Sequence, residues 1–266
     1  MFPELDRTKL NVFLASTEAD YCKRTAMLNP RGAPDLRLKV VQARRASGAS
    51  DESLRNELAK ALEEYLVRIR EAVRAHEHMI YPGALSIRDE FGERENAIRA
   101  ALILTRFDEA MEVASEMLEA HKYIMSAYMA NEHFRETYQE GIEVGMAERD
   151  AFAFLVIGRY KEGFDALERS KQIQQKLGNA LLPGPYFGRE MVEIAEGNEK
   201  GFKEQVHLYL GFYNSHLKDW TGKGGELPFV SVSKSASLSL ARYRGLIEDI
   251  RWLPSEERRW ILWYWT

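Results

Sequence analysis

Carboxylates are the most concentrated chemical groups in this sequence. Between residues 108 and 148 there are ten acidic side chains against two basic ones, Lys122 and Arg135. At about 100° of rotation per residue, nine of the acids fall opposite the apolar positions of two predicted helices. The first helix carries Asp108, Glu109, Glu112, Glu116 and Glu119, and the second carries Glu132, Glu136, Glu140 and Glu143. We call these nine residues the acidic set and expect them to face solvent.

The acidic set favours docking of a basic protein over acid–base catalysis. Pairs such as Glu112 and Glu116 lie one helical turn apart, and like charges at that spacing cost about 0.2 to 0.5 kcal/mol per pair. A sequence that keeps these unfavourable pairs suggests that the acidic surface has a function. An anionic surface steers a basic partner into place. A solvated surface without a partner is the competing interpretation. Solvated carboxyl groups in general titrate too low for catalysis near neutral pH.

The histidines and the single cysteine indicate no metal or nucleophile site. His76 and His78 are two residues apart, so on a helix they point in different directions. His121 lies within an apolar stripe and has no histidine or glutamate four residues on, which predicts a partly buried histidine and not a ligand. Cys22 excludes an intramolecular disulfide, and we expect it to be a small buried hydrophobe. No phosphate loop or nucleophile elbow occurs, so we predict no enzyme activity, catalytic residue, cofactor or metal.

Composition sets limits on the class of protein. The chain has 266 residues, 45% of them hydrophobic, and a net charge of -4, which is enough apolar material for a sizeable core. Residues 101–210 contain 19 acidic and 12 basic groups, and this acidic centre argues against a nucleic-acid partner. The N-terminus has no apolar signal core, and the longest apolar run, residues 151–157, is too short for a membrane span. We therefore expect a cytoplasmic protein with no membrane partner.

Short connectors between amphipathic segments predict helical hairpins. Gly158 and Gly197 are each followed by a polar residue and stand between two helical patterns, as expected where a helix ends on a left-handed residue. Residues 104–109 form a related junction, and a helix is predicted over residues 132–157. The helix after residue 107 has an apolar stripe at helical spacing, formed by Ala110, Val113, Ala114, Met117, Leu118, Ile124, Met125 and Tyr128.

These patterns predict an all-α fold of irregular helical hairpins, stacked as a repeat-like bundle or short solenoid with a docked C-terminal helix. We divide the chain into an N-terminal helical part, residues 1–95, and the hairpins with a C-terminal cap, residues 96–266, packed together as one unit. Four of the five tryptophans lie in the last fifteen residues. They form either a lid on the last hairpin or an exposed patch for a partner.

Two family resemblances bear on function. The connector Gly158-Arg159-Tyr160-Lys161-Glu162-Gly163-Phe164 looks like those of tetratricopeptide-type repeats, although the junctions keep no regular period. From residue 96 onward the layout resembles the immunity protein 49 family of bacterial polymorphic toxin systems. The similar features are the irregular hairpins, residues 209–216 followed by a loop, a small-residue helix over residues 231–245, and the closing Leu253-Pro254 segment. This resemblance implies an all-helical cytoplasmic protein that neutralises a cognate toxin by binding it.

The leading hypothesis is therefore an immunity protein, or antitoxin, whose acidic set covers the basic cleft of a protein toxin. The alternative is a tetratricopeptide-like scaffold or regulator that binds a peptide or small molecule in a concave groove. Aromatic residues such as Tyr160 or Tyr186 would then matter more than the acids. A helical hydrolase, the third class, needs a buried carboxylate pair that sequence patterns do not reveal.

Overall fold

The structure is a computed structural model that describes residues 7–26, 33–77, 84–130, 132–176, 189–222 and 231–262. For residues 75–77, 84–91, 127–129, 132–142, 213, 214 and 216–222 it describes the backbone alone. The described ranges contain helices and turns and no strand. The helices are α1 (Arg7–Thr25), α2 (Ala33–Ser47), α3 (Asp51–Glu77), α4 (Ala84–Ile103), α5 (Phe107–Ala130), α6 (Glu132–Ile157), α7 (Tyr160–Lys176), α8 (Arg189–Glu196), α9 (Glu199–Gly222), α10 (Val232–Tyr243) and α11 (Ser255–Arg258).

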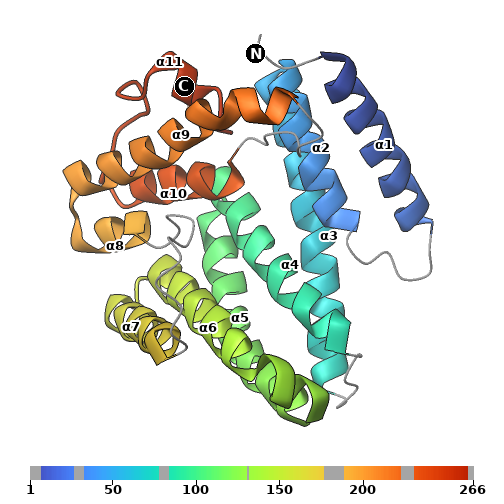
Figure 1. The fold of residues 1–266 in the computed structure, drawn as a ribbon, viewed down its shortest axis with the longest axis vertical. Coiled ribbons are helices and arrows are strands. Elements are labelled where there is room, and N and C mark those ends of the chain that lie inside the picture. The colour runs from blue at the N-terminus through green and yellow to red at the C-terminus, as the bar shows by residue number, and fades with distance from the viewer. Residues whose placement is uncertain are drawn as a thin grey trace.

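The helices pack mainly against their neighbours in the sequence. From α1 to α7 each helix contacts the next one, and α8 pairs with α9. In Figure 1 this series runs from α1 at the right to α7 at the lower left, while α8 to α11 gather at the upper left. Helix α10 breaks the order because it returns to pack against α4. The predicted all-α, repeat-like fold is confirmed.

Five helix ends share one backbone arrangement. A residue with positive φ follows each helix, namely Gly48, Thr105, Gly158, Gly197 and Gly245. In every case the N–H of the next residue donates to the carbonyl five positions earlier, at 2.8 to 3.0 Å. This 6→1 bond satisfies a carbonyl that the helix end leaves free. The structure thus confirms left-handed residues at Gly158 and Gly197, and at the junction after α4 it places a threonine in that conformation.

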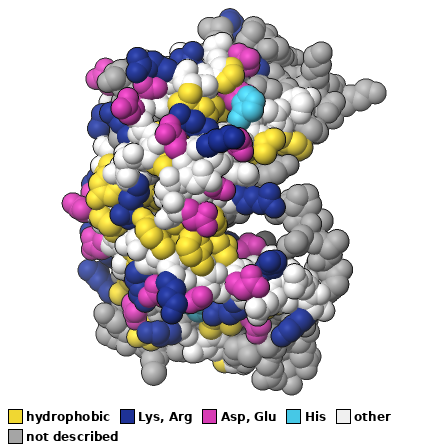
Figure 2. Space-filling view, turned by 90° about the vertical axis from the view of Figure 1, so that its left-hand side faces the viewer, with side chains coloured by type: hydrophobic (Ala, Val, Ile, Leu, Met, Phe, Trp, Pro, Cys, Tyr) yellow, Lys and Arg dark blue, Asp and Glu magenta, His cyan; other side chains and the backbone are white. Residues whose placement is uncertain are grey.

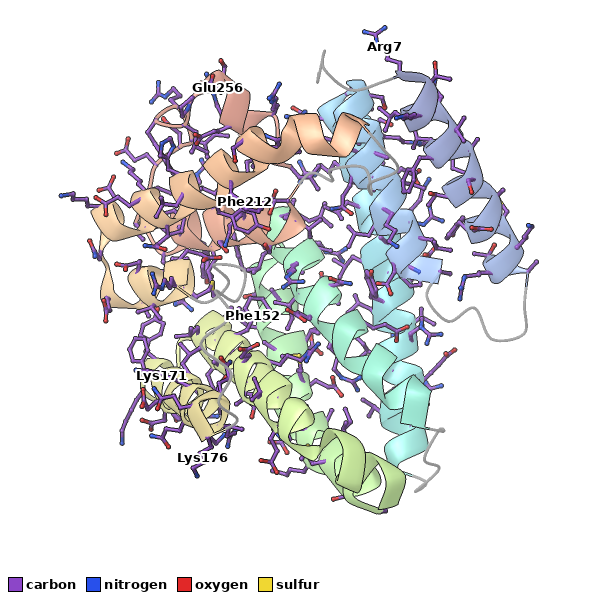
Figure 3. All side chains as sticks on the ribbon, in the orientation of Figure 1. Arg7, Phe152, Lys171, Lys176, Phe212 and Glu256 are labelled. Atoms are coloured by element: carbon purple, nitrogen blue, oxygen red, sulfur yellow. The ribbon has the colours of Figure 1, made fainter. Side chains whose placement is uncertain are left out.

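One hydrophobic cluster runs through the molecule from Leu10 to Leu262. The predicted stripe on α5 contributes Ala110, Val113, Ala114, Met117 and Ile124, all buried. In Figure 3 Phe152 lies among the helices in the middle of the molecule, whereas Arg7 and Glu256 lie at its periphery. The expected boundary at residue 95 falls inside α4, which packs against α3, α5 and α10, so α4 belongs to both expected parts.

The small side chains of α10 hold the C-terminal segment in place. Nine of its twelve residues are buried, among them Ser235, Ser237 and Ser239. The Ser235 hydroxyl donates to the Ser231 carbonyl at 2.6 Å and accepts from the Leu262 N–H at 2.8 Å. Trp260 is fully buried and the four-residue helix α11 packs on α9, as expected for a docked end. Trp263 and Trp265 lie outside the described residues.

Two local expectations are wrong. Cys22 is exposed and not buried, because α1 packs mainly on α2 at the edge of the molecule and leaves this side of the helix in solvent. Helix α9 continues to Gly222, whereas a loop was expected to follow residue 216. Among the helices of the described ranges, none has the length and hydropathy needed to cross a bilayer.

Candidate functional site

The acidic set divides into two rows along α5. Asp108, Glu112 and Glu119 are exposed, whereas Glu109 and Glu116 are half-buried. Rotation about the helix axis explains the division, because the second row lies roughly 70° round the helix from the first, toward the core. On α6, Glu143 is half-buried. The backbones of Glu132, Glu136 and Glu140 lie on α6, but their side chains are outside the described residues.

The half-buried row is neutralised by arginines. Arg94, whose side chain is 1% exposed, donates from Nε to Glu116 Oε2 at 2.6 Å and from Nη2 to Glu116 Oε1 at 2.9 Å. Arg106 donates to Glu109 at 2.6 Å and to Glu63 at 2.9 Å. The expectation that the acidic set faces solvent is therefore wrong for Glu109 and Glu116, and it is wrong for the half-buried Glu143 as well.

The environment of Arg106 shows how firmly this row is held. Partial burial lowers the pKa of Arg106, but the hydrogen bonds to Glu63 and Glu109 outweigh it and raise the pKa above its ordinary value. Arg106 thus links α3 to α5 through two charge-assisted hydrogen bonds. In contrast, Asp108 and Glu112 take part in none of the ion pairs found among the described residues, and Glu119 makes an exposed contact of 3.1 Å with Lys122.

Beside these acids lies a groove between α3 and α5, which we call the α3–α5 groove. Its volume is about 590 Å³. Leu66, Ile69, Val73 and Val113 form its apolar part. Arg70 and Arg74 line the α3 side, and Glu109, Glu112 and Glu116 line the α5 side, with Glu63 and Arg106 completing the lining. The groove therefore has one basic wall and one acidic wall.

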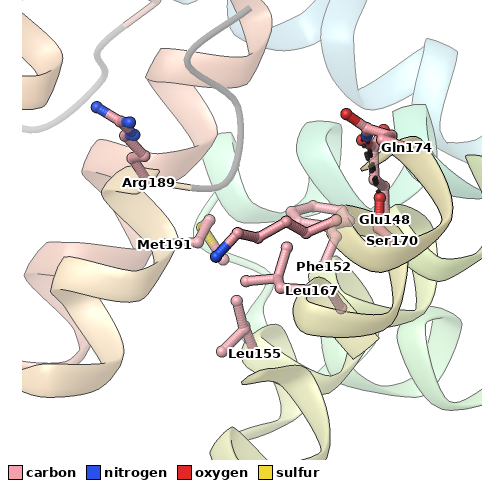
Figure 4. Close-up of a pocket in the computed structure, with 10 residues that line it drawn as sticks. Glu148, Phe152, Leu155, Leu167, Ser170, Gln174, Arg189 and Met191 are labelled. Carbon is pink, nitrogen blue, oxygen red and sulfur yellow. Dashed lines mark hydrogen bonds between the residues drawn. The ribbon is translucent and has the colours of Figure 1, made fainter. Parts of the chain in front are cut away.

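A second hollow lies between α6, α7 and α8. It has a volume of about 330 Å³ and an apolar lining that includes Phe152, Leu155 and Met191. Figure 4 shows its polar side, where Gln174 donates to Glu148 at 3.0 Å and to Ser170 at 3.2 Å. Residues 177–188, which connect α7 to α8, lie outside the described residues.

Two interior polar clusters have structural roles. Glu190 on α8 and Lys234 on α10 are fully buried and form an ion pair, with the Lys234 ammonium 4.3 Å from the Tyr209 ring centroid. Burial lowers the pKa of Lys234, while the charge of Glu190 and its hydrogen bond act in the opposite direction. His121 is partly buried, as expected, with Nδ1 at 2.6 Å from Asp150.

The described residues contain no group of three or more histidine, cysteine, aspartate or glutamate side chains placed to hold a metal ion.

Charged side chains of both signs are interspersed on the face in Figure 2, around a hydrophobic area at mid-height. Surface charge on that face is therefore mixed and not segregated by sign.

Sequence reasoning found the acids but missed the basic wall of the groove. The spacing of Leu66, Ile69 and Val73 is a helical signal, yet the partner helix α5 begins some forty residues later in the chain. Nothing in the sequence places Arg70 and Arg74 opposite the acids of α5.

Comparisons of the chain with protein-family models, with curated proteins and with solved structures find no match. Function is therefore inferred from the side chains, their contacts and the layout of the helices.

Proposed function

We propose that this chain is an immunity protein that neutralises a cognate protein toxin in the cytoplasm by direct binding, and that it is not an enzyme. The observation that carries the proposal is the exposed row on α5. Asp108, Glu112 and Glu119 fall within roughly 40° of one another around the helix, so they present their charges to one partner surface. The layout resemblance to the immunity protein 49 family supports the same role.

The physical benefit of the exposed row is electrostatic complementarity. A toxin that acts on an anionic substrate carries a basic cleft, and an acidic helix laid on that cleft would exclude the substrate. Such complementarity accelerates association and makes it sensitive to salt. Glu109 and Glu116 contribute less, because their charges are already offset by Arg106 and Arg94. We include the acids of α6, Glu132, Glu136, Glu140 and Glu143, in the proposed toxin-binding set on the basis of their sequence positions alone.

The first experiment is purification of the tagged chain from its native cells at low and high salt, with mass spectrometry of the partners. We expect a stoichiometric basic toxin domain that is retained at low salt and loosened at high salt. The absence of any toxin at both salt concentrations would contradict the immunity function.

Charge reversal tests the surface. The variant Asp108→Lys/Glu112→Lys/Glu119→Lys should bind the toxin about 100-fold more weakly, at roughly 1 kcal/mol for each reversed charge. The matched control, Asp165→Lys/Glu204→Lys/Glu248→Lys, reverses three exposed acids on other elements and should bind normally. Equal affinity of the two variants would refute the acidic row as the contact surface.

A scaffold that binds a peptide is the second candidate function, favoured by the α3–α5 groove. In that case the groove, and not the exposed row, would dominate affinity, and the double reversal Asp108→Lys/Glu119→Lys, which leaves the groove residue Glu112 unchanged, would leave binding nearly unchanged.

A further inference from the structure

We propose that the α3–α5 groove receives an amphipathic helix of the partner, with basic side chains on one edge and acidic side chains on the other. The inference deepens the proposed function, and it rests on that function in assigning the helix to the toxin. It adds a second contact beside the exposed row and specifies the chemistry of the bound segment.

The apolar part of the groove has the form of a helix-binding surface. Leu66, Ile69 and Val73 follow the spacing of one face of α3, and Val113 faces them from α5. Leu66 and Val73 are half-buried, so the free protein leaves apolar area for an occupant to cover. From Glu63 to Arg74 the wall is roughly 16 Å long, which matches about three turns of a bound helix. A volume of about 590 Å³ admits several large apolar side chains.

The walls specify the charges of the occupant. Arg70 and Arg74 are exposed and take part in none of the ion pairs found among the described residues, and the same holds for Glu112 across the groove. Opposite charges thus line the two sides of the groove without forming an ion pair, and a helix between them can pair with both. It must present acids to α3 and bases to α5.

The mixed walls also disfavour other occupants. A nucleic acid or an acidic peptide would be repelled by Glu112, and a purely basic peptide would be repelled by Arg70 and Arg74. At one end of the groove Arg106 forms ion pairs with Glu63 and Glu109 and neutralises part of their charge. These three side chains are therefore less available to pair with a ligand. The charges left open are therefore Arg70, Arg74 and Glu112, and these set the specificity.

The test uses the full-length chain and a fluorescently labelled peptide of about 15 residues, held helical by a staple on its solvent face. The peptide has a leucine stripe, one lysine edge and one glutamate edge. We expect saturable binding in fluorescence anisotropy, and at least 10-fold weaker binding of a peptide with the same composition in scrambled order.

Reversing the basic wall provides the decisive comparison. Arg70→Glu/Arg74→Glu should weaken binding of the mixed-edge peptide at least 10-fold and should bind a peptide with two lysine edges more tightly than the unmodified chain does. Arg55→Glu/Lys161→Glu, which reverses two exposed cations away from the groove, should change neither affinity. Far-UV circular dichroism verifies that both variants are folded.

Three results would overturn the groove proposal. The first is no saturation by any peptide up to about 1 mM. The second is equal affinity for the chain and the Arg70→Glu/Arg74→Glu variant. The third is strong coupling between Arg74→Ala and Glu112→Ala in the stability of the free protein, because the walls would then pair with each other and close the groove.

The experiments distinguish a wrong groove proposal from a wrong immunity proposal. If the toxin co-purifies but no peptide binds, the groove proposal is wrong and the immunity proposal stands. If the peptides bind as expected and no toxin co-purifies, the groove binds a helix but the helix does not come from a toxin.

Discussion

Glu112 and Glu116 are the same residue type one helical turn apart, yet the fold uses them differently. Glu112 projects into solvent at the edge of the groove, whereas Glu116 accepts two hydrogen bonds from the buried Arg94 guanidinium. A rotation of roughly 40° between the two positions decides which of them meets α4. At the scale of single residues, a run of acids is therefore not one functional unit.

Substitution by glutamine separates the two roles. Glu116→Gln removes the charge that compensates a buried guanidinium and should lower the free energy of unfolding by about 3 kcal/mol. Glu112→Gln, at an exposed position, should change it by less than about 0.5 kcal/mol. Urea unfolding measures both values. Equal effects would show that the Arg94–Glu116 pair contributes nothing beyond an ordinary surface contact.

At the scale of helices and their junctions, a residue in the left-handed conformation recurs just after the C-terminal ends of five helices. Four of the five junctions have glycine there, and the fifth has Thr105 at φ 63°. A side chain with a Cβ is strained in this region, by about 1 kcal/mol or more. The hydrogen bond from Arg106 N–H to the Ala101 carbonyl, at 2.9 Å, holds the threonine in place.

Substitutions at two junctions test the contribution of the left-handed residue to stability. Thr105→Gly should raise the free energy of unfolding by up to about 1 kcal/mol, because the strain disappears. Gly197→Ala should lower it by about 1 kcal/mol, and the cause is conformational because no atom lies within 4 Å of an added Cβ. Thermal or urea unfolding measures whether each substitution raises or lowers the free energy of unfolding. A destabilising Thr105→Gly would mean that the threonine side chain stabilises the junction.

The buried Glu190–Lys234 pair joins α8 to α10 and should behave as a unit. Lys234→Met alone leaves a carboxylate uncompensated in the interior and should cost about 3 to 5 kcal/mol. The double variant Glu190→Met/Lys234→Met should cost less than either single substitution. Urea unfolding of all three variants provides the double-mutant cycle, and additive costs would show that the two side chains are independent.

The same pair predicts a dependence on pH. Because burial lowers the pKa of Lys234 in the folded state, the unfolded chain binds a proton more tightly than the folded protein does. Stability therefore rises with pH between this lowered pKa and the ordinary value of 10.5. The stability of the unmodified chain relative to Lys234→Met should increase as pH rises through that window. If the stability of the unmodified chain relative to Lys234→Met fell as pH rose, the lowered pKa of Lys234 would be contradicted.

At the scale of the whole molecule, one continuous core links the first helix to the last described residues. Helix α4 is central because it contacts α3, α5 and α10. We expect a single cooperative unfolding transition, with far-UV circular dichroism and tryptophan fluorescence giving the same midpoint. A fragment of residues 96–266 lacks α1 to α3 and more than half of α4, and it should not fold on its own. Separate transitions, or a folded fragment, would show that the two parts are independent.

The sequence by itself determined the limits of α6, the junctions at Gly158 and Gly197, and the buried stripe on α5. The predicted limits of α6, residues 132–157, agree with Glu132–Ile157, and Gly158 and Gly197 adopt the conformation that their positions predicted. These features depend on residues within a turn or two of each other, so periodicity and turn chemistry suffice.

Only the tertiary structure decided which acids remain available and where a groove forms. Glu116 lies 22 residues from Arg94, and Glu63 lies 43 residues from Arg106, so no local pattern connects either pair. The exposure of Cys22 likewise depends on which side of α1 meets α2. Burial and ion pairing are set by neighbours brought together through packing, and the function of a charged helix face depends on those neighbours as much as on its own sequence.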